Sequence, residues 1–254
     1  MEYITSKDNA KIKNFIKLVS DKKYRKQTEL FVCEGEKVLN EAISWGIKID
    51  TLIMSEDFSG KHCENYEELN ATVITVPRHL FEKISDTKSP QGVVFSCPMI
   101  TKNEENFLKN AKKVIILDNL QDPGNMGTII RTGAAFGIDA IILLNNCVDH
   151  YAPKVVRSTM NAIFSIPVIS MSVSDCFEQI NLPIYATYLD EHSQNIGEVD
   201  MHQCAVIIGN ESKGVSEEVA NYADKKIIIP IKSVESLNAS VAASIVMWEM
   251  AKNT

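Results

Sequence analysis

Five short apolar segments in the C-terminal half of the chain limit most strongly what it can fold into. They occupy residues 114–117, 140–144, 184–188, 205–208 and 227–231. Continuous apolar runs, in place of strict apolar and polar alternation, are typical of strands covered on both faces of a parallel sheet. Helical patterns at 126–136 and 239–251 accompany them. This regular alternation of strand and helix predicts an α/β domain that starts near residue 113.

The first hundred residues contain the same two kinds of element in a less regular order. Ile12, Phe15, Ile16 and Val19 repeat at helical spacing, and a second helix is expected at 36–45. Strand-like runs lie at 30–33, 51–54, 72–76 and 92–97, followed by a polar segment at 98–112. We therefore predict a small N-terminal α/β domain at 1–98, a linker at 99–110 and the parallel-sheet domain at 111–254.

The charge of the chain is unevenly distributed along its length. The formal net charge is −7, yet residues 1–26 hold eight basic and only three acidic side chains. An acidic chain does not coat a nucleic acid by bulk charge, but a basic end is compatible with binding to a polyanion. A solvated helix face explains these lysines equally well.

Cysteine and histidine spacing argues against disulfide and metal frameworks. The six cysteines, at 33, 63, 97, 147, 176 and 204, form no CxxC pair and have mostly apolar neighbours, which suits buried reduced thiols. The five histidines show no HxxxH or HExxH spacing, so no metal is expected. The N-terminus lacks the apolar core of a signal peptide, and no segment approaches a membrane span. We expect a soluble, cytoplasmic protein.

Three polar segments follow strands of the predicted parallel sheet. The first, at 118–137, passes through a Pro-Gly turn, and Asn125 is placed to cap the helix that carries Arg131. The second, at 207–216, has a GxxxxG spacing, but Lys213 precedes the last glycine and Val215 follows it, so a phosphate loop is not supported. Because the carboxyl ends of parallel strands form the usual ligand site, these loops are candidates for one.

The third segment, at 227–243, leads from a strand through Pro230 into a helix of small and apolar residues. Amides at the start of this helix could bind an anion. Helical spacing predicts that Val241, Ile245 and Trp248 face the core. No GxGxxG follows any strand, so the fingerprint of the dinucleotide-binding fold is missing.

Taken together, in this order and spacing, the three segments resemble the motifs of the SpoU/TrmH-type RNA ribose 2′-O-methyltransferases, a branch of the SPOUT superfamily. The resemblance covers about residues 113–252. Residues 31–37 and 85–92 resemble the RNA substrate-binding domain that precedes the catalytic domain in many members. Thr128 and Gly133 stand where many members have other small or apolar residues, a mild departure.

The resemblance implies methyl transfer from S-adenosylmethionine, without a metal, to a ribose 2′-hydroxyl of RNA, most often ribosomal RNA. It also implies a deep trefoil knot near the C-terminus and a homodimer that completes each site at its interface. An apolar surface around Trp248 and Met250 is compatible with such a dimer. The residues that match the family's site fall in two groups. Polar active-site positions are Asn125, Arg131, Glu211, Ser236 and Asn238, and donor-binding positions are Gly209, Ile229 and Leu237.

The chemistry of arginine limits the role of Arg131, which is often proposed as the family's base. Deprotonating a free arginine at pH 7 costs roughly 7 kcal/mol, so a bidentate clamp on an RNA phosphate is the better interpretation. A role as the base would require that the bound RNA phosphate takes part. Ser236 and Asn238 would then hold the ribose or relay its proton, and Glu211 would orient Arg131 or another loop donor.

Other functions remain open on the sequence alone. They are a tRNA 2′-O-methyltransferase, a catalytically silent RNA-binding protein of the same fold, and methylation of a small molecule or protein.

Overall fold

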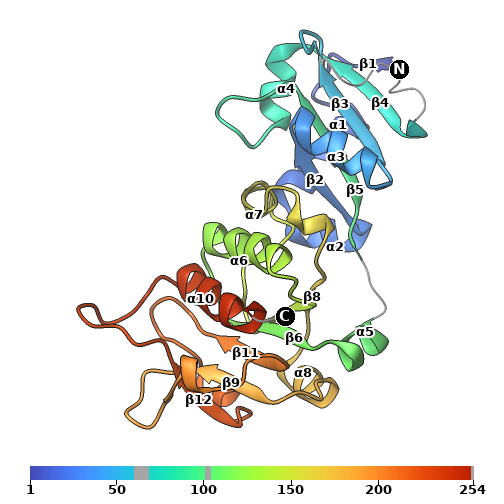
Figure 1. Cartoon of the computed structure of the whole chain (residues 1–254). Coiled ribbons are helices and arrows are strands. Elements are labelled where there is room, and N and C mark those ends of the chain that lie inside the picture. Colours follow the sequence, from blue (N-terminus) through green and yellow to red (C-terminus); the bar gives the residue numbers. More distant parts are fainter. Residues whose placement is uncertain (60–68, 101–103, 253–254) are drawn as a thin grey trace. The chain divides into compact units, whose positions relative to one another are not determined.

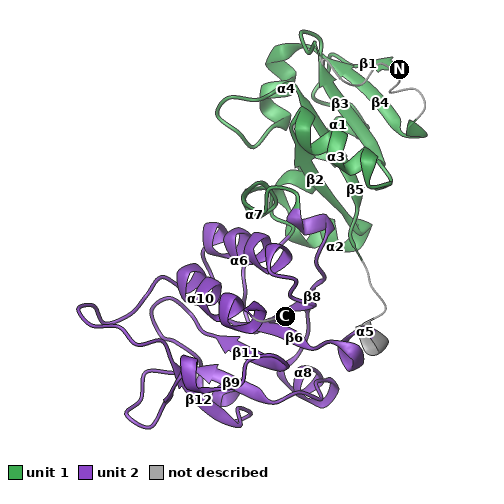
Figure 2. Cartoon of the chain, viewed as in Figure 1, with its two compact units in different colours: residues 1–100, 151–161 green, residues 101–150, 162–254 purple. Residues whose placement is uncertain are grey.

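The computed structural model describes residues 1–59, 69–100 and 104–252, and the chain divides into two compact units (Figures 1 and 2). Unit 1 consists of Met1–Ile100 and Tyr151–Asn161, and unit 2 of Thr101–His150 and Ala162–Thr254. The return of Tyr151–Asn161 to unit 1 is not signalled by any composition change along the chain. Each unit has its own sheet.

Unit 1 is a small mixed α/β structure. Its sheet has the strand order β1-β4-β3-β5-β2, in which β1, β4 and β3 are parallel and β5 runs antiparallel to both β3 and β2. The strands are β1 (Glu2–Tyr3), β2 (Leu30–Glu34), β3 (Thr51–Ser55), β4 (Thr72–Val76) and β5 (Val93–Pro98). The helices are α1 (Ala10–Ser20), α2 (Lys22–Thr28), α3 (Glu36–Ser44), α4 (Arg78–Ile84) and α7 (Pro153–Ser158).

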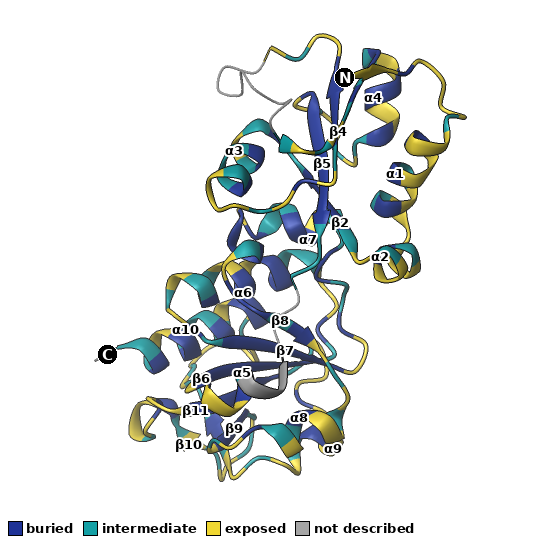
Figure 3. Cartoon of the chain, turned by 90° about the vertical axis from the view of Figure 1, so that its right-hand side faces the viewer, coloured by how far each residue is buried: buried dark blue, intermediate teal, exposed yellow. Residues whose placement is uncertain are grey.

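Helix α1 shows how the first core of unit 1 forms. Asn9 caps its first turn by accepting a hydrogen bond from the Lys11 amide, and the apolar positions then recur at helical spacing. Ile12, Phe15 and Leu18 are buried against β2, β3, β4 and α4. The lysines of α1 and α2 are exposed, whereas Arg25 of α2 is buried. Figure 3 shows both helices with exposed and buried positions.

Unit 2 contains a seven-stranded, fully parallel sheet with the order β10-β12-β9-β11-β6-β7-β8. Its strands are β6 (Lys113–Asp118), β7 (Ala140–Leu144), β8 (Val168–Ser170), β9 (Ile184–Thr187), β10 (Gln194–Asn195), β11 (Cys204–Ile208) and β12 (Lys225–Ile228). Its helices are α5 (Glu104–Asn110), α6 (Pro123–Ala135), α8 (Val173–Gln179), α9 (Glu217–Ala220) and α10 (Ala239–Ala251), with short 3₁₀ turns at Ala162–Phe164 and Ile196–Glu198. The predicted α/β class with a parallel C-terminal sheet is confirmed.

The apolar runs of unit 2 are buried because helices cover both faces of the sheet. Every residue of β6, β7 and β11 is buried. One set of alternate residues, which includes Ile116 and Ile142, forms a core with α8 and α9. The opposite set includes Ile141, which lies beside Gly133 of α6 together with Met247 of α10. Helices α6 and α10 pack against each other on that second face (Figure 1).

Two expectations about local packing are wrong. Asp122, and not Asn125, caps α6, because Pro123 takes the first helical position and the Asp122 carboxylate accepts from the Asn125 amide at 2.8 Å. Val241 and Trp248 of α10 are 47% and 54% exposed, so they do not face the core. The buried side of α10 is formed by Ala243, Val246, Met247 and Met250, which also removes Met250 from any exposed apolar surface.

The five cysteines in the described ranges are free and buried, and Cys63 lies outside those ranges. None of the described helices has the length and apolar content needed to cross a membrane.

Candidate active site

The candidate site lies at the carboxyl ends of β6 and β11. From β6 the chain moves outward through β7 to β8 and later returns to place β11 on the other side of β6. The sheet therefore changes direction of winding between β6 and β11, and such a switch point is the usual place for a ligand in an open α/β sheet. The first two polar loops predicted from the sequence begin there, after Asp118 and Ile208.

Three of the predicted active-site residues form one hydrogen-bonded chain. The Asn125 Nδ2 donates to the Glu211 Oε1 at 2.9 Å, and the Asn238 Nδ2 donates to the Asn125 Oδ1 at 3.0 Å. Asn125 is only 8% exposed, so its amide needs these partners. The three residues come from the first turn of α6, the loop after β11 and the N-cap of α10, and their contacts hold these segments together.

The cap of each helix fixes one end of this chain. Asp122 caps α6 and so fixes the turn that carries Asn125. Asn238 caps α10, because its Oδ1 accepts from the Ser240 amide at 2.9 Å and the Val241 amide at 3.3 Å. The side chain of Asn238 thus caps a helix with its oxygen and contacts Asn125 with its nitrogen.

Glu211 is held by the loop that follows β11. Its Oε1 also accepts from the Asp122 amide at 3.4 Å, and its Oε2 accepts from the Asn210 Nδ2 at 3.3 Å. Asn210 in turn donates to the Asn119 carbonyl at 2.9 Å and accepts from the Ser212 amide. Of the two roles expected for Glu211, the structure shows contact with loop donors and no contact with Arg131.

Gly209 is required by a close approach of the backbone. A Cβ at this position would lie 2.1 Å from the Gly214 carbonyl carbon and 2.1 Å from the Val215 nitrogen. Any side chain would therefore displace the loop that carries Asn210 and Glu211. This explains the first glycine of the second polar segment without a phosphate loop.

A cavity of about 450 Å³ lies beside these loops. Gly209, Glu211, Ile229, Ser236 and Leu237 all line it, so three of its lining residues are the predicted donor-binding positions. Its volume is within the range of roughly 300–1,000 Å³ that is usual for small-molecule sites. In the described part of the chain, no three His, Cys, Asp or Glu side chains gather in a metal-binding group.

Arg131 is not brought together with the other predicted residues. It lies six residues after Asn125 on α6, is exposed, and makes no hydrogen bond or ion pair with any described residue. It also does not line the cavity. Its guanidinium is therefore available to a ligand or to a second chain.

Sequence reasoning missed two residues that support the site. The carboxylate of Asp118, which is 1% exposed, accepts from the Asn145 Nδ2 at 2.5 Å and from the Ser216 amide at 2.8 Å. The Cys147 thiol accepts from the Leu120 amide at 3.2 Å and donates to the Leu117 carbonyl. Burial is the main cause that raises the pKa of this thiol, to about 11. Asp118 ends an apolar strand inside the first polar segment, a position that could have indicated its role.

Solved structures with this fold define the class of the protein. An AdoMet-bound rRNA methyltransferase from Sinorhizobium meliloti is 28% identical to the chain, with a TM-score of 0.87, over 98% of this chain and 97% of that one. The SpoU methyltransferase AviRb from Streptomyces viridochromogenes, in complex with AdoMet, is 25% identical, with a TM-score of 0.85, over 96% and 97% of the two chains. The fold is that of the SPOUT methyltransferases.

Sequence comparison identifies the family. The model of the SpoU rRNA Methylase family matches residues 112–248, and that of the MRM3-like substrate binding domain matches residues 9–94. The 23S rRNA (guanosine(2553)-2′-O)-methyltransferase RlmP of Bacillus subtilis is 32% identical, over 98% of this chain and 99% of its own length. The chain belongs to the SpoU rRNA methylase family. The predicted resemblance is confirmed, and so is the enzyme class it implied, an RNA ribose methyltransferase.

Proposed function

We propose that the chain transfers a methyl group from S-adenosylmethionine to a ribose 2′-hydroxyl of ribosomal RNA. The observation that carries this proposal is the hydrogen-bonded chain of Asn125, Glu211 and Asn238 beside the cavity, in a member of the SpoU rRNA methylase family. The solved relatives with bound AdoMet and the ribosomal RNA specificity named for the Bacillus relative support the donor and the substrate.

The cavity fits this donor in size and in the character of its walls. Ile229 and Leu237 supply apolar surface, and the strand-end loops supply backbone amides and carbonyls. Gly209, which also lines the cavity, keeps two backbone segments close together. By the resemblance to the family, Gly209, Ile229 and Leu237 hold the donor largely through their backbone groups, and the side chains of Ile229 and Leu237 add apolar contact. When bound, S-adenosylmethionine supplies a methyl group that its positively charged sulfur has already activated.

The protein's own contribution is then to align the hydroxyl and help it lose its proton. Alignment alone can lower a barrier by ~7–11 kcal/mol. Asn125 and Asn238 present their amides in a fixed geometry, because Glu211 and the two helix caps hold them. Ser236, which is exposed at the cavity, holds the ribose or relays its proton. Arg131 stays protonated and clamps an RNA phosphate.

A homodimer belongs to this proposal. Val241 and Trp248 form an exposed apolar stripe on α10, and Trp248 packs edge-on against Phe136 with ring centroids 5.8 Å apart. Arg131 is exposed on the adjoining helix α6, away from its own chain's cavity. Both features favour pairing through α6 and α10, with Arg131 completing a site at the interface. Sedimentation that gave a concentration-independent 28.3 kDa species would argue against this dimer.

The remaining expectations form part of the same proposal. They are an RNA substrate-binding domain at 1–98, a linker at 99–110, a methyltransferase domain at 111–254 and a trefoil knot near the C-terminus. The late insertion of β11 between β6 and β9 supports a threaded topology, and the family match at 9–94 supports the first domain. A cytoplasmic location is consistent with free cysteines and a ribosomal RNA substrate.

Transfer of a tritiated methyl group tests the proposal against its alternatives. The full chain is incubated with labelled S-adenosylmethionine and equal amounts of ribosomal RNA and tRNA, which are then separated. We expect label on ribosomal RNA. Label on tRNA alone would identify a tRNA methyltransferase, whereas RNA binding without any label would identify a silent RNA-binding protein.

A further inference from the structure

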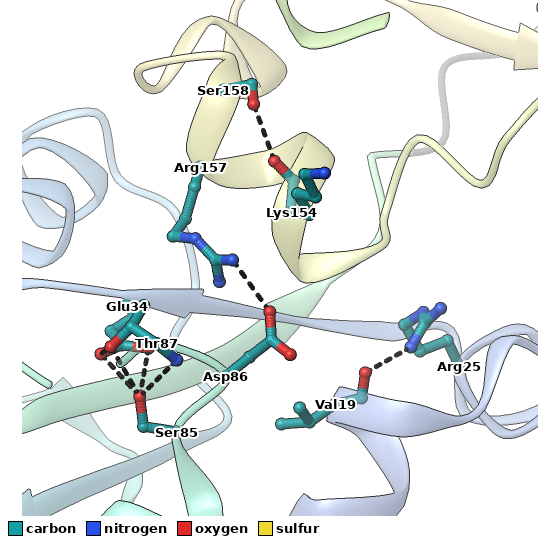
Figure 4. Close-up of polar contacts among 9 residues, drawn as sticks. All are labelled: Val19, Arg25, Glu34, Ser85, Asp86, Thr87, Lys154, Arg157 and Ser158. Carbon is teal, nitrogen blue, oxygen red and sulfur yellow. Dashed lines mark hydrogen bonds and ion pairs between the residues drawn. The ribbon is translucent and has the colours of Figure 1, made fainter. Parts of the chain in front are cut away.

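Unit 1 contains a second cavity, of about 290 Å³, that the proposed methyl transfer does not use. It lies where the end of β2, the start of α3, the loop after α4, and α7 meet. Figure 4 shows the polar side chains around this place, with Arg157 reaching from α7 toward Asp86 and with Glu34 beside Ser85 and Thr87. All of the lining residues belong to unit 1.

The walls of this cavity are aliphatic and its lining carries no net charge. Val19, Val32, Val38, Ile84, Val94 and Val156 supply the apolar surface. The charged lining residues are two acids and two bases, of which Arg157 and Asp86 form an ion pair at 2.9 Å. A neutral, mostly apolar cavity favours an uncharged, flat ligand over a phosphate group.

Polar groups at the mouth of the cavity both accept and donate hydrogen bonds. The Glu34 carboxylate is oriented by the hydroxyls of Ser85 and Thr87, each at 2.8 Å, and a carboxylate has further lone pairs that can accept from a ligand. Gly35 precedes α3 and has no side chain that could cap this helix.

Gln91 lies over the bare Cα of Gly35, where an added Cβ would be 2.8 Å from its Oε1. The Gln91 amide is exposed and makes no hydrogen bond to another described residue. It therefore can both donate to and accept from a ligand at the mouth of the cavity.

The backbone on the α7 side of the cavity is strained. Met160 and Asn161 have φ values of 48° and 75°, and both line the cavity. Asn tolerates this left-handed conformation, but Met does so rarely, and such strain concentrates at functional sites. The Asn161 side chain is fixed by donating to the Glu41 carboxylate.

We propose that this cavity binds one unpaired nucleobase of the RNA substrate. A base is flat, apolar on its faces and uncharged, and its edge carries the donors and acceptors that Glu34 and Gln91 complement. The exposed lysines of α1 and α2 lie in the same unit and would hold the adjoining phosphates. The inference rests on the proposed function, because it assigns part of substrate selection to unit 1.

Methyl NMR on the full chain, with labelled valine and isoleucine, tests base binding directly. The probes are GMP, AMP, CMP and UMP at millimolar concentration, with S-adenosylhomocysteine present to occupy the donor cavity. Ribose 5-phosphate serves as a control that carries sugar and phosphate but no base. We expect at least one nucleotide to shift the methyl signals of Val38 and Val156, and ribose 5-phosphate to leave them unchanged. Equal shifts with ribose 5-phosphate, or none with any nucleotide, would overturn the proposal.

Two variants connect the cavity to RNA. Val38→Phe fills the cavity, and Val73→Phe on β4, outside the lining, is its matched control. Gln91→Ala removes an exposed side-chain amide, and Gln27→Ala on α2 is its control. We expect Gln91→Ala to raise the KM for ribosomal RNA about fivefold, the effect of one hydrogen bond, with kcat and donor affinity unchanged. Val38→Phe should abolish the nucleotide shifts.

These results separate the inference from the proposed function. If the wild type methylates ribosomal RNA but Gln91→Ala and Val38→Phe behave like their controls, the base-binding proposal is wrong and the methyltransferase proposal stands. If no RNA is methylated while nucleotides shift the methyl signals of the cavity, the methyltransferase proposal is wrong and base binding by the cavity stands.

Discussion

The side-chain amide of Asn238 serves two loops at once. Its oxygen caps α10 and its nitrogen donates to Asn125, which itself donates to Glu211. Because each end has a different partner, substitution can remove one function and keep the other. Substitutions of Asn238 can therefore separate its structural role, the helix cap, from its role in the site, the contact with Asn125.

Asn238→Asp should keep the helix cap and impair transfer. Aspartate caps a helix as well as asparagine, but it replaces the donor to the Asn125 Oδ1 with an acceptor. We expect an unfolding free energy close to that of the wild type and a methylation rate reduced by at least about tenfold. Asn238→Ala, the control, should also lose about 1 kcal/mol of stability. Equal rates for Asn238→Asp and wild type in single-turnover assays would show that the amide contact is not needed.

Arg131→Lys should remain badly impaired although it keeps the positive charge. The ammonium of lysine is a point charge and cannot replace the planar, bidentate guanidinium on a phosphate. Donor affinity should be unchanged, since Arg131 does not line the donor cavity. Ser236→Ala should slow transfer and also leave donor affinity near that of the wild type. Calorimetry and single-turnover methylation, run in parallel, check both variants. Wild-type methylation by Arg131→Lys would refute the clamp.

At the scale of the element, the sequence predicts the strands better than the helix faces. Runs such as Ala140–Leu144 are apolar throughout, and parallel strands covered on both faces require this. Helix α10 is apolar on all sides, so no stripe in its sequence indicates which side packs inward. The cap of α6 is predicted wrongly at Asn125, because Pro123 takes the first helical position and makes the preceding Asp122 the cap.

The contacts between loops lie beyond what periodicity can predict. The family motifs identify Asn125, Glu211 and Asn238 as site residues. They do not predict the hydrogen bonds among these residues, which join positions 86 and 113 residues apart. Such long-range pairs depend on the order of strands in the sheet, which a single sequence does not specify. The position of Asp118 at the end of an apolar strand hints at a role, but only the structure shows its partners, Asn145 and Ser216.

Gly209→Ala should disrupt the loop that follows β11. The new methyl group would lie 2.1 Å from two backbone atoms, which no side-chain rotation can relieve. We expect the variant to lose donor binding and at least about 2 kcal/mol of stability, within the usual range for strain at a special backbone site. Gly137→Ala, where an added Cβ meets nothing within 4 Å but φ is 66°, is the control for backbone strain alone. If Gly209→Ala binds the donor like wild type, the close approach at Gly209 is not required.

The parallel sheet and its covering helices should lose stability in alkaline solution. Burial raises the pKa of the Cys147 thiol to about 11, and of Cys176 and Cys204 to about 12, from 9.0. Below pH 9 the thiols are protonated in both states and their full contribution to stability is present. As the pH rises above 9, the thiols of the unfolded chain lose their protons first, so the folded state becomes less stable relative to the unfolded one. For each thiol, the free energy of unfolding falls by at most about 3–4 kcal/mol once the pH has passed the pKa of the folded state.

Urea unfolding between pH 8 and pH 11 measures this effect. The midpoint should fall as the pH increases, and Cys176→Ala should make the fall shallower. A midpoint that does not change with pH above 9 would contradict the burial of these thiols.

The two units of the molecule cannot be separated by dividing the chain at a single position, because unit 1 also contains residues 151–161. Helix α7 is far along the chain but belongs to unit 1, where the Tyr151 ring packs 4.6 Å from that of Phe31. A chain that lacks residues 1–98 therefore also loses the packing partners of α7. Point variants in each unit test the separate roles of unit 1 in RNA binding and unit 2 in methyl transfer better than truncation does, because they leave both cores intact.

The proposed reaction places one methyl group on a ribose oxygen of ribosomal RNA. The most direct measurement uses ribosomal RNA from cells of the source organism that lack the gene, incubated with the protein and S-adenosylmethionine, and maps modified nucleotides by nuclease digestion and mass spectrometry. We expect a single new 2′-O-methylated nucleotide with the wild-type protein and almost none with Arg131→Lys. Methylation on a base, or no methylation of this RNA by a protein that binds the donor, would show that the proposed reaction is wrong.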